Sequence, residues 1–306
     1  MSPLCLSTMY ARADYLDGDW HAFAGLARDA GCSHVEASHV TDEPGLHALA
    51  EIGEPPLISL HAPTPRERVN GRWNSELNLA STDEHHRRLA VTHHLRTLQR
   101  AVDVGARWVV VHLGGAGDDM YDEERELRRR FDAGRWGTPD IDRLREAARA
   151  RRAASRPRAF AQARRSLAEL LAEARRLSIT IGIENRYHFH EIPDPDETAS
   201  LLREFAASPV GYWHDVGHAE VLHRLGFHNR SRWLQELLPD AVGIHLHDVL
   251  GIGDHRAPGR GDVDWAPIAA ALPAEAVRTL EIAPGEPRDA VLTAAPLLRA
   301  RGVLVR

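Results

Sequence analysis

The 306-residue chain is 43% hydrophobic and 27% charged, which is typical of a globular protein and excludes a disordered or fibrous one. Its net charge of −6 with neutral histidine provides no general drive toward nucleic acid or an anionic membrane surface. All 38 basic residues are arginine, which excludes a Schiff-base lysine, a pyridoxal phosphate anchor and a phosphate-loop lysine, whereas 19 histidines point to imidazole chemistry.

Short apolar and β-branched runs recur along the chain and alternate with amphipathic segments. The predicted strands are, in chain order, Pro3–Met9, His34–Ala37, Leu57–His61, Trp108–Leu113, Ile179–Glu184, Val210–Asp215, Val242–His247 and Arg278–Ile282. The predicted helices are Trp20–Ala30, Thr82–Val104, Pro157–Leu177, Asp196–Ala206, Trp233–Leu238 and Asp289–Arg301. Strands that alternate with helices indicate βα units and a parallel sheet. Eight such units favour an α/β fold, the closed (β/α)8 TIM barrel; the alternative is a doubly wound open sheet, which usually has a glycine-rich first turn.

The connection between the fourth and fifth predicted strands is oversized. It runs over residues 114–178 and is rich in arginines that alternate with acids. Two interpretations stay open: a pair of solvated helices, or a helical excursion that covers the site or forms a subunit contact. Gly134, Gly137 and Pro139 are expected at its turns. Because no linker or repeat is visible, we predict a single domain over residues 1–306 with this helical insertion inside it.

Two further observations limit the class of protein. Cys5 and Cys32 are too few for a disulfide framework or a thiolate zinc site, and their apolar contexts predict small buried side chains. No stretch approaches the roughly 20 apolar residues of a membrane helix, and MSPLCLSTMY lacks the basic start and apolar run of a signal peptide. We therefore expect a cytoplasmic protein without a membrane partner.

Nearly every predicted strand stays apolar until its end, where a potential metal ligand appears. In chain order these residues are His61, His112, Glu184, Asp215, His245 and Glu281, joined by His218 after the sixth strand and His255 after the seventh. The carboxyl ends of barrel strands meet at one rim, where active sites of such barrels lie. One histidine or glutamate at a strand end is ordinarily a hydrogen-bonded structural residue, but six together predict a bound divalent cation. Imidazole mixed with carboxylate suits Zn, Mn, Fe or Co better than Ca.

Several motifs together resemble the xylose isomerase-like barrel superfamily, which contains sugar isomerases and epimerases and also the endonuclease IV group. The resemblance covers nearly the whole chain and is carried by LNLASTDEHHRRLAVTHHLRTLQRAVDVGARWVVVHLG, IGIEN, HDVGHAE, HLHD and PGRGDVDW. These motifs are specific for the superfamily and poorly specific for one reaction. The insertion before IGIEN is not part of the common pattern.

The resemblance implies a ligand set residue by residue. The metal site shared by the isomerases and epimerases would be Glu184, Asp215, His245 and Glu281. The endonuclease IV group adds ligands for further zinc ions, which match His61, His112, His218 and His255. That group also has an aspartate two residues before the loop histidine, where this chain has Gly253 beside Asp254. One, two or three metals therefore remain open.

Two enzymatic functions are compatible with these residues. The first is a metal-dependent isomerase, epimerase or lyase of a sugar or polyhydroxy carbonyl compound, with a metal-stabilised enediolate. The resemblance implies that Glu184 and Glu281 bind the metal and exchange protons, and that His218 contacts a substrate oxygen. Arg186, His188 and His190 are either further substrate contacts or part of a polar surface loop, and His247 is another candidate substrate contact.

The second function is a zinc phosphodiesterase that, like endonuclease IV, cuts DNA at abasic sites. The additional histidines favour it, but an acidic chain lacks the basic footprint that nucleic-acid binding requires. A barrel that only binds sugar is a third class, and it would have lost the core ligands that this chain retains. We favour a small-molecule substrate over nucleic acid as the partner and leave a homo-oligomer open.

Overall fold

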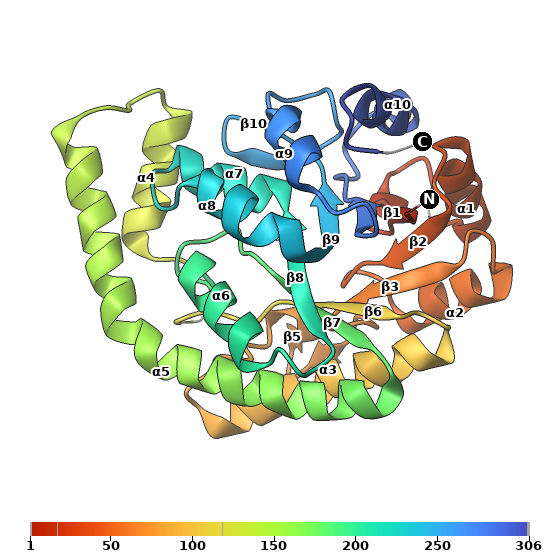
Figure 1. Ribbon diagram of the computed structural model, residues 1–306, viewed down its shortest axis with the longest axis horizontal. Helices are drawn as coiled ribbons and strands as arrows, with labels where there is room; N and C mark the ends of the chain where they lie inside the picture. Colours follow the sequence, from red (N-terminus) through yellow and green to blue (C-terminus); the bar gives the residue numbers. More distant parts are fainter. Residues whose placement is uncertain (1, 17, 118, 305–306) are drawn as a thin grey trace.

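Eight parallel strands close into a barrel in the computed structural model, which describes residues 2–16, 18–117 and 119–304 (Figure 1). The order around the barrel is β1 (Leu4–Ser7), β12 (Val277–Leu280), β9 (Ala241–Leu246), β8 (Val210–Asp215), β7 (Thr180–Glu184), β6 (Trp108–Val111), β3 (Leu57–His61) and β2 (His34–Ala37). The predicted (β/α)8 barrel is confirmed, and closure of the sheet excludes the doubly wound alternative.

Helices cover the outside of the barrel. They are α1 (Trp20–Asp29), α2 (Glu43–Ile52), α3 (Glu84–Asp103), α4 (Asp122–Asp132), α5 (Pro139–Leu177), α6 (Pro195–Glu204), α7 (Val216–Arg224), α9 (Trp265–Ala271) and α10 (Arg288–Ala300). The sequence analysis missed α2, α7 and α9. The predicted α-helix Trp233–Leu238 is a different type of helix in the structure. One α-turn, α8 (Arg230–Arg232), is followed by a π-helical turn over Trp233–Leu237 and a 3-10 turn over Leu238–Asp240. Pro239 in the last turn has no N–H with which to continue an α-helix.

Aspartates set where several helices begin. Asp19, Asp42, Asp83, Asp194 and Asp215 each accept the backbone N–H of the residue three positions later. Asp215 is also the last residue of β8, so the strand passes directly into α7 at the rim. This cap fixes His218 beside Asp215, because the Oδ1 atom of the aspartate accepts the His218 backbone N–H at 2.6 Å.

The connection between β6 and β7 contains α4 and α5. Gly134 and Gly137, both at positive φ, lie in the turn between the two helices, and Pro139 begins α5, as predicted. The predicted start of the second helix at Pro157 is wrong, because α5 continues through this proline for 39 residues, about 58 Å. A proline removes one helical hydrogen bond, and tertiary contacts on both sides of Pro157 hold the helix together. Figure 1 shows α5 running along one edge of the molecule, with α4 beside its N-terminal half.

Trp213 fills the barrel below the rim. Its ring is fully buried and packs with Cys5, Ile58, Val110 and Val277. A Cβ atom on Gly243 would lie 2.2 Å from this ring and one on Gly182 2.7 Å from it, so both positions require glycine. Because residues two apart on a strand point to the same side, this layer lies directly beneath Glu184, Asp215 and His245.

Other structural predictions can be compared directly. Cys5 and Cys32 are buried free thiols, as predicted. Two short hairpins were not predicted: β4 (Arg68–Val69) with β5 (Arg72–Trp73), and β10 (Asp248–Leu250) with β11 (Gly253–Arg256). Among the described residues, no helix combines the length and apolarity needed to cross a membrane.

Candidate metal centre and adjoining cavity

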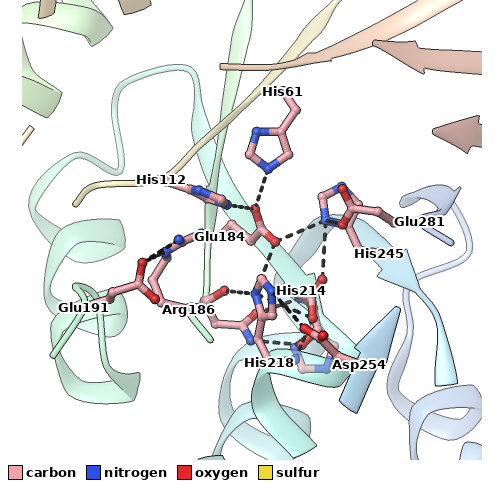
Figure 2. Close-up of polar contacts among 12 residues, drawn as sticks. His61, His112, Glu184, Arg186, Glu191, His214, His218, His245, Asp254 and Glu281 are labelled. Carbon is pink, nitrogen blue, oxygen red and sulfur yellow. Dashed lines mark hydrogen bonds and ion pairs between the residues drawn. The ribbon is translucent and has the colours of Figure 1, made fainter. Parts of the chain in front are cut away.

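Glu184, at the end of β7, lies at the centre of the polar rim (Figure 2). Its Oε2 atom is 3.0 Å from Nε2 of His61 and 2.7 Å from Nε2 of His112, and its Oε1 atom is 3.1 Å from Nδ1 of His245. His61 ends β3, and His112 follows β6 by one residue. The three strand ends thus bring three imidazoles to one fully buried carboxylate.

His245, on β9, lies close to carboxylates from the two neighbouring strands. Its Nδ1 atom is 3.0 Å from Oε2 of Glu281 and 3.6 Å from Oδ2 of Asp215. On the other side of the ring, Nε2 lies 3.0 Å from Oε1 of Glu36, a fully buried residue of β2. In the tautomer with the proton on Nε2, the Nε2–H donates a hydrogen bond to Glu36 and the lone pair of Nδ1 points toward Glu281 and Asp215. A metal-ligating histidine has this arrangement.

A third group lies beside the first two. Asp254 approaches His255 at 3.2 Å (Oδ1 to Nδ1) and His218 at 3.8 Å (Oδ2 to Nε2), while Nε2 of His255 is 3.5 Å from Oε2 of Glu281. Asp254 thus places a carboxylate beside His218 and His255, although position 253 is glycine. Four overlapping groups place their ligand atoms within 4.8 Å of one another: His61, His112, Glu184; Glu184, Asp215, His245, Glu281; His218, Asp254, His255; and Asp215, His247, His255, Glu281.

The donor set fits a divalent transition metal. Burial disfavours ionisation of Glu184, but the adjacent imidazoles of His112 and His245 outweigh it and hold the pKa of Glu184 well below its usual range. Burial likewise disfavours ionisation of Glu281, but the adjacent imidazole of His245 outweighs it and holds the pKa of Glu281 well below its usual range. Buried ionised carboxylates mixed with imidazole nitrogens are the borderline N/O ligands that Zn, Mn, Fe and Co share.

His247 is placed differently from its predicted role as a substrate contact. It is fully buried, its Nδ1 accepts the backbone N–H of His255 at 2.9 Å, and its Nε2 lies 3.0 Å from Oδ2 of Asp215. Both ring nitrogens are therefore used inside the protein. In this tautomer Nε2–H donates to Asp215 and orients that carboxylate.

A cavity of about 330 Å³ adjoins the cluster at His112. Its walls include Arg186 and His190, two of the predicted substrate contacts, and also His39, His94 and Glu191. Arg186 is held by Glu191, whose Oε1 atom accepts from Nη2 at 2.6 Å and from Nε at 3.2 Å (Figure 2). Burial opposes ionisation of Glu191, but Arg186 and the neighbouring histidines outweigh it and lower its pKa to about 2.

The sequence analysis missed His39 and Glu36. His39 follows the end of β2 by two residues, so the rule applied to the other strand ends would have found it. Its ring centroid is 5.2 Å from that of His61, and burial together with His61 lowers its pKa to about 3. Glu36 lies inside the strand, where the only signal is a charged residue in an otherwise apolar run.

The helices of the β6–β7 connection support the loop that follows β7. Glu124 of α4 is fully buried, and its carboxylate lies 3.2 Å from Nδ1 of His188 and accepts the Phe189 backbone N–H at 3.0 Å. Arg152 of α5 donates to the carbonyls of Phe189 and Glu191. His188 thus faces α4 and does not line the cavity, whereas the connection fixes the wall that carries Arg186 and His190.

Comparison with known proteins agrees with this architecture. A family model described as xylose isomerase-like TIM barrel matches residues 24–300. A D-tagatose 3-epimerase-like protein is 17% identical with a TM-score of 0.66, covering 98% of this chain and 96% of that one. An L-ribulose 3-epimerase is 14% identical with a TM-score of 0.68, covering 99% and 95% of the two chains.

The structure of an IolI protein with a bound zinc atom is 15% identical with a TM-score of 0.63, covering 98% of each chain. At these identities the likeness shows a shared fold. No curated protein sequence matches. The match of the family model over most of the sequence shows that the chain belongs to the xylose isomerase-like TIM barrel family.

Proposed function

We propose that this chain is a metal-dependent isomerase or epimerase, or a related lyase, that acts on a sugar or another polyhydroxy carbonyl compound. The observation that carries the proposal is the pair of Glu184 and Glu281. Both side chains are buried. A carboxylate oxygen of Glu184 lies 3.1 Å from Nδ1 of His245, and one of Glu281 lies 3.0 Å from the same atom. The two glutamates come from the ends of β7 and β12, which are separated in the barrel by β8 and β9. The names of two structural neighbours, a 3-epimerase and a 3-epimerase-like protein, support the same class.

The residues that would hold the metal are Glu184, Asp215, His245 and Glu281. A divalent ion bound there would supply Lewis-acid polarisation of the carbonyl and hydroxyl oxygens of the substrate. Two further ligand groups share Glu184 or adjoin Glu281: His61 with His112, and His218 with Asp254 and His255.

The carboxylates of the chain perform the proton transfers in this proposal. Glu281, ionised at neutral pH, accepts the proton from the carbon next to the substrate carbonyl and later releases it to solvent. Glu184 takes a proton from the imidazolium of His61, whose Nε2 atom is 3.0 Å from its Oε2 atom, and delivers it to that carbon from the other side; solvent then reprotonates His61. If the proton is returned to the opposite face of the same carbon, the configuration of that carbon is inverted, which is epimerisation. If the proton is returned to the neighbouring carbon, an aldose and a ketose are interconverted, which is isomerisation. His218 donates Nδ1–H to the Asn185 carbonyl at 2.9 Å, which leaves Nε2 to accept a substrate hydroxyl hydrogen or to bind a metal.

An endonuclease IV-like zinc phosphodiesterase is the second candidate. One observation favours it: Asp254 completes a third ligand group with His218 and His255, so the chain offers ligands for a multinuclear cluster. Such a cluster would activate water and clamp a phosphate. The acidic net charge opposes a DNA substrate, because counterion release supplies most non-specific DNA affinity.

One experiment separates the two functions. Metal-loaded protein is incubated in D₂O with a panel of ketoses and related keto compounds. Deuterium uptake into the substrate carbon and product formation are both measured, because a hydride shift between substrate carbons would form product without deuterium uptake. We expect one compound to exchange or isomerise in a metal-dependent way, and Glu281→Gln to abolish it, because the variant loses a base and a ligand.

Glu126→Gln on the outer side of α4 is the matched control and is expected to keep full activity. The same preparation is tested on an abasic-site duplex at physiological salt, where we expect no cleavage. Metal-dependent cleavage of the duplex with no activity on the panel would overturn the proposal and establish the phosphodiesterase.

A further inference from the structure

Three residues that line the cavity beside the metal centre each carry a buried side-chain nitrogen that the protein leaves unpaired. Among the described residues, Nη1 of Arg186 and Nδ1 of His190 and of His39 are buried without a hydrogen-bond partner. His190 is only 7% exposed. A buried polar atom without a partner destabilises the fold, so three of them on residues that line one cavity indicate a site that a ligand completes.

The acceptors near these atoms are already occupied. Glu191 uses Oε1 for Nε and Nη2 of Arg186, and its Oε2 accepts the backbone N–H of His188 at 2.8 Å. Glu76 lies exposed at the mouth of the cavity and accepts the backbone N–H of Trp73. The inner wall therefore presents a guanidinium edge and imidazoles, with no free carboxylate among the described lining residues.

The chemistry of the unpaired atoms selects the ligand group. A guanidinium edge can only donate, and neutral imidazoles next to it can each turn one N–H toward the same acceptor. A hydroxyl brings a donor with each acceptor, whereas carboxylate and phosphate oxygens only accept, and arginine binds both groups well. His94 differs: Nδ1 donates to the Ala90 carbonyl at 2.8 Å, so Nε2 is left as an acceptor for a ligand hydroxyl.

We propose that this cavity is a subsite for an oxyanion, a carboxylate or phosphate at the end of the substrate, held by Arg186 with His190 and His39. The proposal rests on the proposed function, since it takes the reacting carbons to lie at the metal centre. His112 belongs to both the centre and the cavity wall, so one small molecule can reach both. Glu191 acts by orienting the guanidinium.

The test uses three probes that share a hydroxyketone and differ in one end: dihydroxyacetone, dihydroxyacetone phosphate and hydroxypyruvate. Binding to metal-loaded protein is measured by calorimetry at fixed ionic strength. We expect at least one anionic probe to bind tenfold or more tightly than the neutral one. The anion that gains identifies phosphate or carboxylate as the natural group.

Arg186→Met is expected to remove this advantage, with unchanged metal content and unchanged affinity for dihydroxyacetone. Arg186→Lys keeps the positive charge but lacks the two-pronged guanidinium, and it is expected to recover part of the tighter binding of the anionic probe. This variant keeps the test decisive if Arg186→Met does not fold. Arg158→Met, at an exposed arginine beside a neighbouring cavity, is the matched control and is expected to behave as wild type.

Equal affinities for all three probes would overturn the proposal. An anion preference that survives Arg186→Met would also overturn it, because the metal alone would then bind the oxyanion. Failure of the proposed function gives a different result. The protein would show no proton exchange on any keto compound, while the anion preference and its dependence on Arg186 would persist.

Discussion

Glu36 contacts one ring nitrogen of His245 and leaves the other facing the candidate metal centre. Its Oε1 atom faces Nε2 of His245, and its Oε2 atom accepts from Ser59 at 2.7 Å and from Thr279 at 3.2 Å, so the carboxylate cannot turn away. A carboxylate behind a ligating imidazole fixes the tautomer and raises ligand basicity. Glu36 is therefore a positioning residue for the centre.

Replacing Glu36 by leucine is expected to weaken metal binding by about 10- to 100-fold, the usual effect of losing such a partner. Competition with a chromophoric chelator measures this directly and needs no substrate. Glu36→Gln keeps an acceptor for Nε2–H and is expected to recover much of the affinity. Equal metal affinity in wild type and Glu36→Leu would contradict the positioning role.

Residues at strand ends were the most predictable part of the site. His61, His112, Glu184, Asp215, His245 and Glu281 were found because an apolar strand that ends in a polar residue is conspicuous in the sequence, and the structure brings them together. Glu36 on β2 reaches His245 on β9 past two intervening strands, and Asp254 reaches His218 from a neighbouring loop of the rim; no local pattern encodes these contacts. His247 and His188 show the converse, since each sits at the rim but turns to a protein partner.

At the scale of elements, α4 and α5 connect the outer wall of the barrel to the substrate side of the rim. Leu127 and Ile141 from these helices pack in one apolar cluster with Phe189 of the β7–α6 loop and Phe227 after α7. Buried Glu124 and Arg152 then bond the backbone of that loop. These contacts join the two helices to the loop that lines the cavity, while a role in covering the site or in a subunit contact stays a prediction.

Glu124→Gln is expected to raise KM by about tenfold, with a smaller change in kcat. The neutral amide loses its charge-assisted contacts to Arg128 and His188, which loosens the cavity wall but leaves the ligands untouched. Steady-state kinetics and elemental analysis check both parts. Glu126→Gln, at a partly exposed carboxylate of the same helix paired with Arg129 and Arg130, is the control. Loss of metal from Glu124→Gln would contradict a role confined to the wall.

The start of α5 shows why element boundaries are harder to predict than elements. Proline is common in the first turn of a helix, and the predicted helix begins at Pro157. In the structure, Arg152, five residues earlier, is buried and pairs with Asp194 and Glu197, so the helix is already anchored before the proline. Tertiary ion pairs of this kind join residues about 40 positions apart and leave no periodic signal in the sequence.

At the scale of the whole molecule, buried neutral histidines make stability depend on pH. Burial lowers the pKa of His94 on α3 to about 4, against about 6.5 in an unfolded chain. As the pH falls, the unfolded state binds the proton first. The contribution of neutral His94 is therefore complete above about pH 6.5 and is lost as the pH falls toward 4.

Between pH 8 and pH 5 this one residue is expected to reduce the free energy of unfolding by about 2 kcal/mol. Urea unfolding of metal-free protein at the two pH values measures the loss, and His94→Gln is expected to lose about 2 kcal/mol less than wild type. His21→Gln, at an exposed position of α1, is expected to follow wild type. An identical loss in wild type and His94→Gln would contradict the prediction.

The layer around Trp213 has a consequence for how this scaffold can change its substrate. Gly182, Trp213 and Gly243 each precede a candidate metal ligand by two residues, so any side chain added to the glycines would displace the ring and the candidate ligands above it together. Mutational tolerance is thus unevenly distributed along the same strands. A library intended to redirect specificity should leave positions 182, 213 and 243 fixed, and should randomise position 39 and the β7–α6 loop, whose backbone α4 and α5 hold in place while its cavity-facing side chains vary.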